Sequence, residues 1–341
     1  MVLRRSRLVR YGLALPHYDF SGPRAEAVTY ASVREAARDA ERMGFHSVWI
    51  SDHFFLSLAR YGGSTELHGS LEPLTTLAAL AAETERVRLG TLVLGAPFRP
   101  PAILAKMATA VDLLSGGRLD LGIGAGWYED EFRAFGYEFG STSDRFEILE
   151  ETMVVLKALF ADGPVDHAGK RFRLTGAYNR PAPAHAGGPP IWLGAKGGQR
   201  SLRLAARLAD GWNTVWRWTL EDYADRVKAA RVACEQEDRD PETLRLSVGL
   251  YTLVGEDRPD LERRYRIAQE WAPRGSLGRQ SLEEYSRGAL VGTPEQVLET
   301  AARFQELGVE EIVVSPAPVP FAIPDPSMLD VLSEAVIRGP R

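Results

Sequence analysis

The stretch that decides the fold is VRLGTLVLGAPFRPPAILAKMATAVDLLSGGRLDLGIG, residues 87–124. Short apolar runs at 87–95 and 119–124 predict two buried strands. Between them, residues 101–114 carry apolar side chains three and four positions apart, which is typical of an amphipathic helix. A strand, a helix and a strand in this order predict one parallel βα unit.

The same alternation continues in both directions from this unit. Apolar or β-branched runs predict six further strands, at 9–16, 46–52, 190–195, 211–216, 246–254 and 310–315. Helical periodicity recurs between them, at 30–43, 144–160, 199–209, 220–237 and 294–307. Eight mostly apolar strands that alternate with helices favour an α/β protein with a closed (β/α)8 TIM barrel over an open sheet.

Two stretches depart from a minimal barrel. Residues 165–177, with HAGKR at their centre, predict a hairpin, and the proline-rich segment PAPAHAGGPP follows it, so we expect an insertion near 165–188. The polar stretch 272–290 is long for a connection and is either a lid or a second insertion. Because no break in composition marks a boundary, we expect a single domain over 1–341.

Composition and charge narrow the classes of partner. Of the 341 residues, 45% are apolar and 26% charged, enough to bury a sizeable core. The 41 basic and 46 acidic residues give a net charge of -5, without the positive surplus typical of proteins that bind nucleic acid or anionic membranes. We therefore expect no nucleic acid and no membrane partner, and a small molecule as substrate.

The cysteine and histidine inventory narrows the chemistry. Cys234 is the single cysteine, which excludes an internal disulfide and favours a buried helix residue over a reactive thiol. The six histidines form no His-x-His pair and no HExxH motif, so we expect no metal site. The basic N-terminus resembles a signal peptide, but its apolar stretch is interrupted by Arg10 and ends at His17 and Asp19, which favours a cytoplasmic protein.

Barrel enzymes carry their active sites at the C-terminal ends of the strands. The residues at these ends are strongly aromatic, and among them are His17, Asp52, His53, Phe54, Phe55, Tyr61, Trp127, Tyr128, Trp216 and Trp218. Flat apolar faces with a few histidines suit a planar heterocycle better than a phosphosugar. His53 beside Asp52 is either a functional group of this mouth or a structural histidine.

Two glycine-rich segments bear on ligand binding. In IWLGAKGGQRSLRLAARLADGW, residues 191–212, a strand runs through Gly197 and Gly198 into a helix near Gln199. Free amides at such a helix start, with Lys196 nearby, make a candidate phosphate cradle, and an ordinary glycine turn is the alternative. LDLGIGAGW, residues 119–127, does not open a dinucleotide-binding helix, so its glycines are expected to let a ligand ring approach the backbone.

The chain resembles the luciferase-like oxidoreductases, also called the bacterial luciferase superfamily. The matching stretches are WISDHF at 49–54, LEPLTTLAALAAETERVRLGTLVLG at 71–95, RPPAILAKMATAVDLLSGGRLDLGIGAGWYEDEFRAFG at 99–136, DRFEILEE at 144–151, PPIWLGAKGGQRSLRLAARLADGWN at 189–213 and GTPEQVLETAARFQELGVEEIVV at 292–314. Within the family, the SDH, GAGW and KGG segments are most similar to the branch that uses the deazaflavin coenzyme F420.

This resemblance implies roles for individual residues. It makes His53 the catalytic residue beside the deazaflavin ring and Asp52 the partner of the polar edge of the ring. The implied cofactor-binding residues are Asp52, Leu92, Val93, Gly95, Ala125, Lys196, Gly197 and Gly198, the last three at the phosphate. The substrate-binding candidates are His17, Tyr61, Glu72, Trp127 and Trp216. In sugar-phosphate dehydrogenases of the branch a glutamate stands where this chain has Trp127, which argues against glucose 6-phosphate, with Glu129 as a candidate replacement.

The implied reaction is hydride transfer between coenzyme F420 and an organic substrate, with His53 as proton donor, since histidine titrates near neutrality. The acidic tail of the cofactor is expected to run along Lys196, Arg200 and Arg217. One alternative is a two-component monooxygenase that takes reduced FMN from a separate cofactor reductase. A barrel that binds flavin without catalysis is another.

Two structural features also follow from the resemblance. Family members carry a non-proline cis peptide in the third strand, which by position lies between Leu92 and Val93. They commonly pair as symmetric homodimers, and the apolar segments 101–114 and 74–82 are expected to supply that interface.

Overall fold

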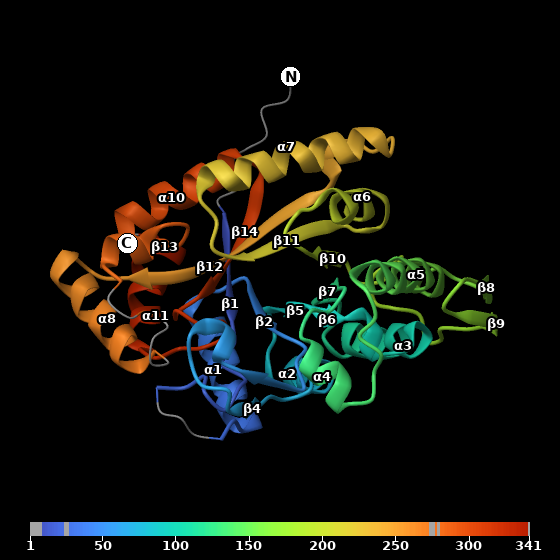
Figure 1. Cartoon of the computed structure of the whole chain (residues 1–341), viewed down its shortest axis with the longest axis horizontal. Helices are drawn as coiled ribbons and strands as arrows, with labels where there is room; N and C mark the ends of the chain where they lie inside the picture. The colour runs from blue at the N-terminus through green and yellow to red at the C-terminus, as the bar shows by residue number, and fades with distance from the viewer. Residues whose placement is uncertain (1–8, 24–26, 273–276, 278–279, 340–341) are drawn as a thin grey trace.

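The computed structural model describes residues 9–23, 27–272, 277 and 280–339 (Figure 1). Within them, eight parallel strands close into a barrel. Its neighbours are, in order, β1 (Arg10–Ala14), β2 (Ser47–Ile50), β5 (Arg88–Thr91), β7 (Leu119–Gly124), β10 (Ile191–Gly194), β11 (Gly211–Trp216), β12 (Arg245–Val254) and β14 (Val309–Ser315), which pairs with β1. The predicted (β/α)8 TIM barrel is therefore confirmed.

Helices connect the strands and cover the outside of the barrel (Figure 1). They are α1 (Tyr30–Met43), α2 (Pro73–Glu83), α3 (Pro101–Leu114), α4 (Glu129–Ala134), α5 (Thr142–Phe160), α6 (Gln199–Leu208), α7 (Leu220–Gln236), α8 (Arg258–Trp271), α9 (Leu282–Ser286), α10 (Pro294–Glu306) and α11 (Ser327–Leu332), with short turns η1 (Ala59–Tyr61), η2 (Ala96–Phe98), η3 (Pro241–Thr243) and η4 (Ser333–Ile337). No helix among the described residues is long and apolar enough to cross a membrane.

Local sequence explains where these helices begin and end, as α1 illustrates. Thr29 and Ser32 form a reciprocal capping box at its start, and Gly44 ends it with a φ of 93°, a left-handed conformation that glycine adopts without a Cβ penalty. Its buried residues, Val33, Ala37 and Ala40, lie three or four positions apart on the face against the barrel.

The third strand contains a break. It pairs as β5 and then as β6 (Leu94–Gly95), and the peptide bond between Leu92 and Val93 is cis, as the family resemblance predicted. A second non-proline cis peptide, between Val215 and Trp216 at the end of β11, was not predicted.

Two antiparallel hairpins extend the barrel. The predicted hairpin is confirmed as β8 (Val165–Ala168) and β9 (Arg173–Ala177), which project beyond α5 (Figure 1). A second hairpin, β3 (Phe55–Ser57) with β4 (Leu67–Gly69), follows β2 and was not predicted.

The expected lid or insertion at 272–290 lies partly outside the described residues, at 273–276 and 278–279. Its described part contains α9 and reaches β13 (Leu290–Gly292), which pairs with β12. The assignment of 1–341 to a single domain remains a prediction.

Inside the barrel, two buried tryptophans lie edge to face with ring centroids 6.4 Å apart, Trp49 on β2 and Trp192 on β10. Their rings fill the space beside two glycines, since a Cβ at Gly90 or Gly211 would lie 2.2 Å from an indole carbon. The Trp49 indole donates to Glu311 at 3.0 Å, and burial raises the pKa of that carboxyl. Both indoles belong to the apolar cluster that also contains Leu92 and, at its edge, Val93, Tyr61, Tyr128 and Trp216.

Candidate active site

His53 lies just beyond the end of β2 and forms a pair with a buried carboxylate. Its Nδ1 is 2.9 Å from Oε1 of Glu131, whose side chain is 1% exposed. The second oxygen, Oε2, accepts the Phe54 backbone N–H at 3.0 Å. Glu131 lies on α4, and its role beside His53 was not predicted from the sequence. The replacement suggested there, Glu129, forms an ion pair with Arg133 at 2.6 Å instead.

Aromatic rings surround the open edge of His53. Trp127 and Tyr128, which follow β7, lie edge-on to the imidazole with centroid distances of 5.4 and 6.2 Å. The Trp127 side chain is 40% exposed, and the Arg60 guanidinium lies 4.3 Å above its ring. The structure thus brings His53 and Trp127 together, as predicted, and adds Arg60.

Tyr61 and Trp216 line the same apolar cluster. Burial raises the pKa of Tyr61 to about 12, so its phenol is neutral at pH 7. Trp216 stacks on Tyr251 at 5.8 Å and meets the edge of Phe321 at 5.3 Å. Both side chains are partly exposed, and their contact with a substrate stays a prediction.

Asp52 is buried within a network of hydrogen bonds. Its carboxylate accepts hydrogen bonds from both terminal nitrogens of Arg99, at 2.6 and 2.9 Å, and from the Gly95 amide at 2.9 Å. Arg99 also donates to Glu72 at 2.6 Å. Asp52 therefore ties the ends of β2 and β6 together, and the ring contact expected of it remains a prediction.

Glu72 has a structural role, and the substrate contact expected of it remains a prediction. It caps α2 by accepting the Thr75 amide at 2.6 Å and pairs with Arg99. Burial alone would raise the pKa of Glu72, but the bonds from Thr75 and Arg99 outweigh it and lower the pKa.

His17 is enclosed by the protein, and the substrate contact expected of it remains a prediction. The side chain is fully buried, with Nδ1 2.9 Å from the Leu15 carbonyl and Nε2 3.0 Å from the Ser51 hydroxyl, which also contacts Tyr18. Burial lowers the pKa of His17 to about 4, so its ring is neutral at pH 7.

Two glycines of LDLGIGAGW, Gly122 and Gly124, make room for the third strand at Thr91 and Val93, and the expected approach of a ligand ring to this segment remains a prediction. A Cβ at Gly124 would lie 2.9 Å from a Val93 methyl, and one at Gly194 on β10 would lie 2.6 Å from the other. A Cβ at Gly122 would overlap the Thr91 carbonyl oxygen at 1.9 Å. Leu92 is buried and Ala125 partly buried beside these positions, and their cofactor contacts remain predictions.

The turn between β10 and α6 leads into a helix whose first backbone N–H groups are not capped by a side chain. Gly198 is the N-cap residue and no side chain caps α6, while Gly197 adopts a φ of +76°. Lys196 bonds to the Val215 carbonyl, and desolvation followed by the charge of Arg60 lowers the pKa of Lys196. The predicted cradle residues thus lie together with a free helix N-terminus.

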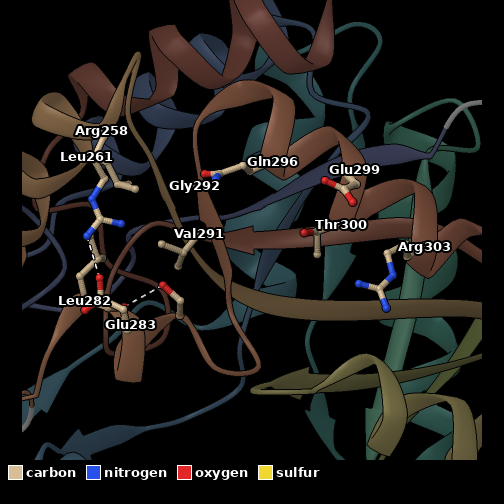
Figure 2. Close-up of a pocket in the computed structure, with 11 residues that line it drawn as sticks. Arg258, Leu261, Leu282, Glu283, Val291, Gly292, Gln296, Glu299, Thr300 and Arg303 are labelled. Atoms are coloured by element: carbon tan, nitrogen blue, oxygen red, sulfur yellow. Dashed lines mark hydrogen bonds and ion pairs between the residues drawn. The ribbon is translucent and has the colours of Figure 1, made fainter.

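A separate cleft of about 450 Å³ lies between α8, α9, β13 and α10 and contains none of the predicted site residues (Figure 2). Arg258 in this cleft points toward Glu283 and donates to it at 2.7 Å. Across the described part of the chain, no group of three or more histidine, cysteine or acidic residues could hold a metal ion.

A comparison with models of protein families finds one family that matches most of the chain. The model of the family described as Luciferase-like monooxygenase matches residues 9–311. The chain belongs to the luciferase-like family.

Relatives within the luciferase-like family include oxidoreductases of several kinds. The chain is 33% identical over 254 residues to a phthiodiolone/phenolphthiodiolone dimycocerosates ketoreductase of Mycobacterium sp. (strain JLS), a match that covers 70% of this chain and 64% of that relative. It is 32% identical over 243 residues to an F420-dependent glucose-6-phosphate dehydrogenase of Amycolatopsis mediterranei (strain U-32), covering 70% of this chain and 69% of the relative. An F420-dependent secondary alcohol dehydrogenase in complex with an F420-acetone adduct has the same fold, with a TM-score of 0.74, 19% identity and coverage of 96% and 98% of the two chains.

Proposed function

We propose that this luciferase-like protein is an oxidoreductase that transfers hydride between coenzyme F420 and an organic small molecule. The observation that carries the proposal is the set of cations around the mouth of the barrel that have no carboxylate partner. Relatives named for coenzyme F420 support the same cofactor.

The four cations are Arg60, Lys196, Arg200 and Arg217, and none of them forms an ion pair within the described residues. Their contacts are instead to the Trp127 ring, to the Val215 carbonyl, to the Ser143 hydroxyl and to the Tyr285 and Arg287 carbonyls. Since most other arginines in the described chain pair with carboxylates, these cations favour an anionic ligand with several charges. The polycarboxylate tail of a deazaflavin matches this requirement, whereas riboflavin phosphate needs only the helix start.

The residues present also fit the phosphate of that cofactor. A Cβ at Gly198 would meet nothing closer than Ser201 Oγ at 4.0 Å, so the space in front of α6 is open. A Cβ at Gly197 would lie 3.0 Å from Trp212 and 3.1 Å from Arg226, which leaves little room for a side chain there. Gly197, Gly198 and Lys196 would hold the phosphate, with the first amides of α6 directed to it.

When bound, the deazaflavin supplies the hydride-accepting or hydride-donating carbon. The chain supplies the rest. Trp127, Tyr61 and Trp216 exclude water and orient a flat or apolar substrate, and His53 holds or delivers the proton at the mouth. Glu131 holds the His53 ring in place.

The substrate class follows from the same walls. The family resemblance implies a glutamate in sugar-phosphate dehydrogenases of the F420 branch where this chain has Trp127. The Trp127 ring is covered by Arg60. An aromatic wall favours substrates with apolar surface over glucose 6-phosphate. We propose an alcohol or carbonyl compound of that kind.

Titration of the apoprotein with each cofactor at two salt concentrations tests this function. We expect coenzyme F420 to bind more tightly than FMN in oxidised and reduced form. Salt should weaken the binding contributed by the charged tail of coenzyme F420, because exposed charge pairs are screened. The binding contributed by the deazaflavin ring should change little. Tighter binding of reduced FMN, followed by oxygen uptake with substrate, would instead establish the two-component monooxygenase that takes flavin from a separate reductase.

A further inference from the structure

Glu131 holds two consecutive residues of the mouth with one carboxylate. Oε1 contacts the His53 ring at Nδ1, 2.9 Å away, and Oε2 accepts the Phe54 backbone N–H at 3.0 Å. Glu131 is 1% exposed and His53 14% exposed, so the pair is shielded from water on the carboxylate side. The proposed function uses Glu131 only to hold the His53 ring and does not say which ring nitrogen carries the hydrogen.

The chemistry of the pair determines where the proton of the neutral imidazole lies. An ionised carboxylate only accepts hydrogen bonds, so the His53 nitrogen that faces it carries the hydrogen. Nε2 then has a free lone pair. Within the described residues Nε2 has no hydrogen-bond partner, and it is not among the buried atoms that lack one, so solvent reaches it.

We propose that Glu131 is a positioning residue that fixes His53 as the Nδ1–H tautomer and thereby makes Nε2 the nitrogen that exchanges the proton with substrate. The proposal rests on the proposed role of His53 in hydride transfer. It adds the residue that sets the tautomer and the atom that acts.

The surrounding aromatic residues keep this geometry rigid. Phe54 stacks on Phe135 at 4.1 Å and packs against Phe98 at 4.6 Å, which holds the Phe54 N–H in position. On α4, Phe132 is fully buried and packs 4.7 Å from Phe98. Glu131 and the backbone of His53 and Phe54 are therefore anchored to one aromatic cluster.

The variant Glu131→Gln tests the tautomer because glutamine has one acceptor oxygen for two donors. The Phe54 N–H cannot become an acceptor, so the amide oxygen should turn to it and the amide NH₂ should face His53 Nδ1. The ring must then move its hydrogen to Nε2. In the cofactor-free protein labelled with ¹⁵N-histidine, we expect His53 to change from the Nδ1–H to the Nε2–H pattern in NMR spectra at a pH where the ring is neutral.

The matched control is Glu151→Gln. Glu151, on α5, pairs with His167 at 3.0 Å and accepts the Phe172 N–H at 2.8 Å, so it contacts the β8–β9 hairpin away from the mouth. This variant should leave the His53 pattern and turnover unchanged. Glu131→Gln should lower kcat about 10-fold to 100-fold, less than the loss of a whole acid–base contribution because His53 itself remains, with the cofactor Kd within about 2-fold of wild type.

Several results would overturn the proposal. A wild-type His53 in the Nε2–H form would do so without any variant, and so would an unchanged tautomer or unchanged kcat in a folded Glu131→Gln protein. If the glutamine variant does not fold, Glu131→Asp decides, because its carboxylate should retain the Nδ1–H pattern. Since the spectra are recorded without cofactor, a failure to turn over coenzyme F420 would refute the proposed function and leave the tautomer result standing.

Discussion

At the scale of single residues, two histidines near the ends of neighbouring strands have different surroundings. His17 is fully buried and bonded through both ring nitrogens, whereas His53 keeps one nitrogen open to solvent. Position after a strand pointed to both of them, but burial and partners separate the structural ring from the candidate catalytic one.

Replacing His53 with alanine should abolish most turnover and leave the fold intact. The side chain is partly exposed and its loss opens no core cavity, so we expect the thermal midpoint to change little, while single-turnover hydride transfer falls by about 10²-fold to 10⁴-fold. A large loss of stability with unchanged chemistry per folded molecule would make His53 structural.

His17 should make stability depend on pH. Its folded pKa of about 4 lies below the unfolded value near 6.5, so protonation favours the unfolded chain: the stability is complete above pH 6.5 and is lost as the pH falls toward 4. By pH 5 the loss attributable to this group is about 2 kcal/mol. The free energy of unfolding is measured with urea at pH 8 and pH 5. Its decrease from pH 8 to pH 5 should be smaller in His17→Gln than in wild type. Some decrease should remain, because His46, whose pKa is also lowered to about 4, is present in both proteins. Equal drops would contradict this assignment.

At the scale of elements, the strand positions could be predicted because eight apolar runs alternate with helices, and β7, α1 and α3 match the expected bounds. The helix α8 was missed because charged residues dominate it and few of its side chains are buried. The site was harder. Glu131 meets His53 across 78 positions of sequence, and only the folded barrel brings them together. An acidic residue shortly after a strand end was the available signal, and it pointed to Glu129, two positions too early.

The start of α6 allows a test that separates helix stability from anion binding. Gly198 has a φ of −69° and open space at its Cβ, so an aspartate fits there. Gly198→Asp should cap the helix and stabilise the fold by about a few tenths of a kcal/mol relative to glycine, so the thermal midpoint should stay the same or rise slightly. It should also weaken cofactor binding at least about 10-fold, because its charge lies where the phosphate is proposed to bind. Gly198→Asn supplies the cap without the charge, and equal Kd values for the two variants would argue against a phosphate at this turn.

At the scale of the whole molecule, the outer face of α3 bears on assembly. Ile103 and Leu114 are 57% and 60% exposed and lie eleven positions apart, on one side of the helix. We propose that this face, with the neighbouring α2, pairs two copies into a homodimer, as the family resemblance suggested. The expectation of a cytoplasmic protein remains a prediction.

Light scattering at micromolar concentration checks the dimer. We expect twice the chain mass of 37.6 kDa for the wild type and a shift toward the single mass for Ile103→Glu, since burying a carboxylate in an apolar interface is costly. Val232→Glu, at a 49% exposed position on α7, is the control and should remain a dimer. A wild type at the single mass would refute the proposal.

The packing of Val93 against Gly124 and Gly194 has a consequence for how this barrel can evolve. The methyl groups of one valine occupy the space that side chains on two different strands would need. A substitution of Gly124 or Gly194 by alanine needs a smaller side chain at position 93 to make room for the added methyl group. Substitutions that are harmful one at a time can therefore be tolerated as pairs. Relatives that differ at these positions should have changed them jointly, and libraries for new substrates should vary the three codons together.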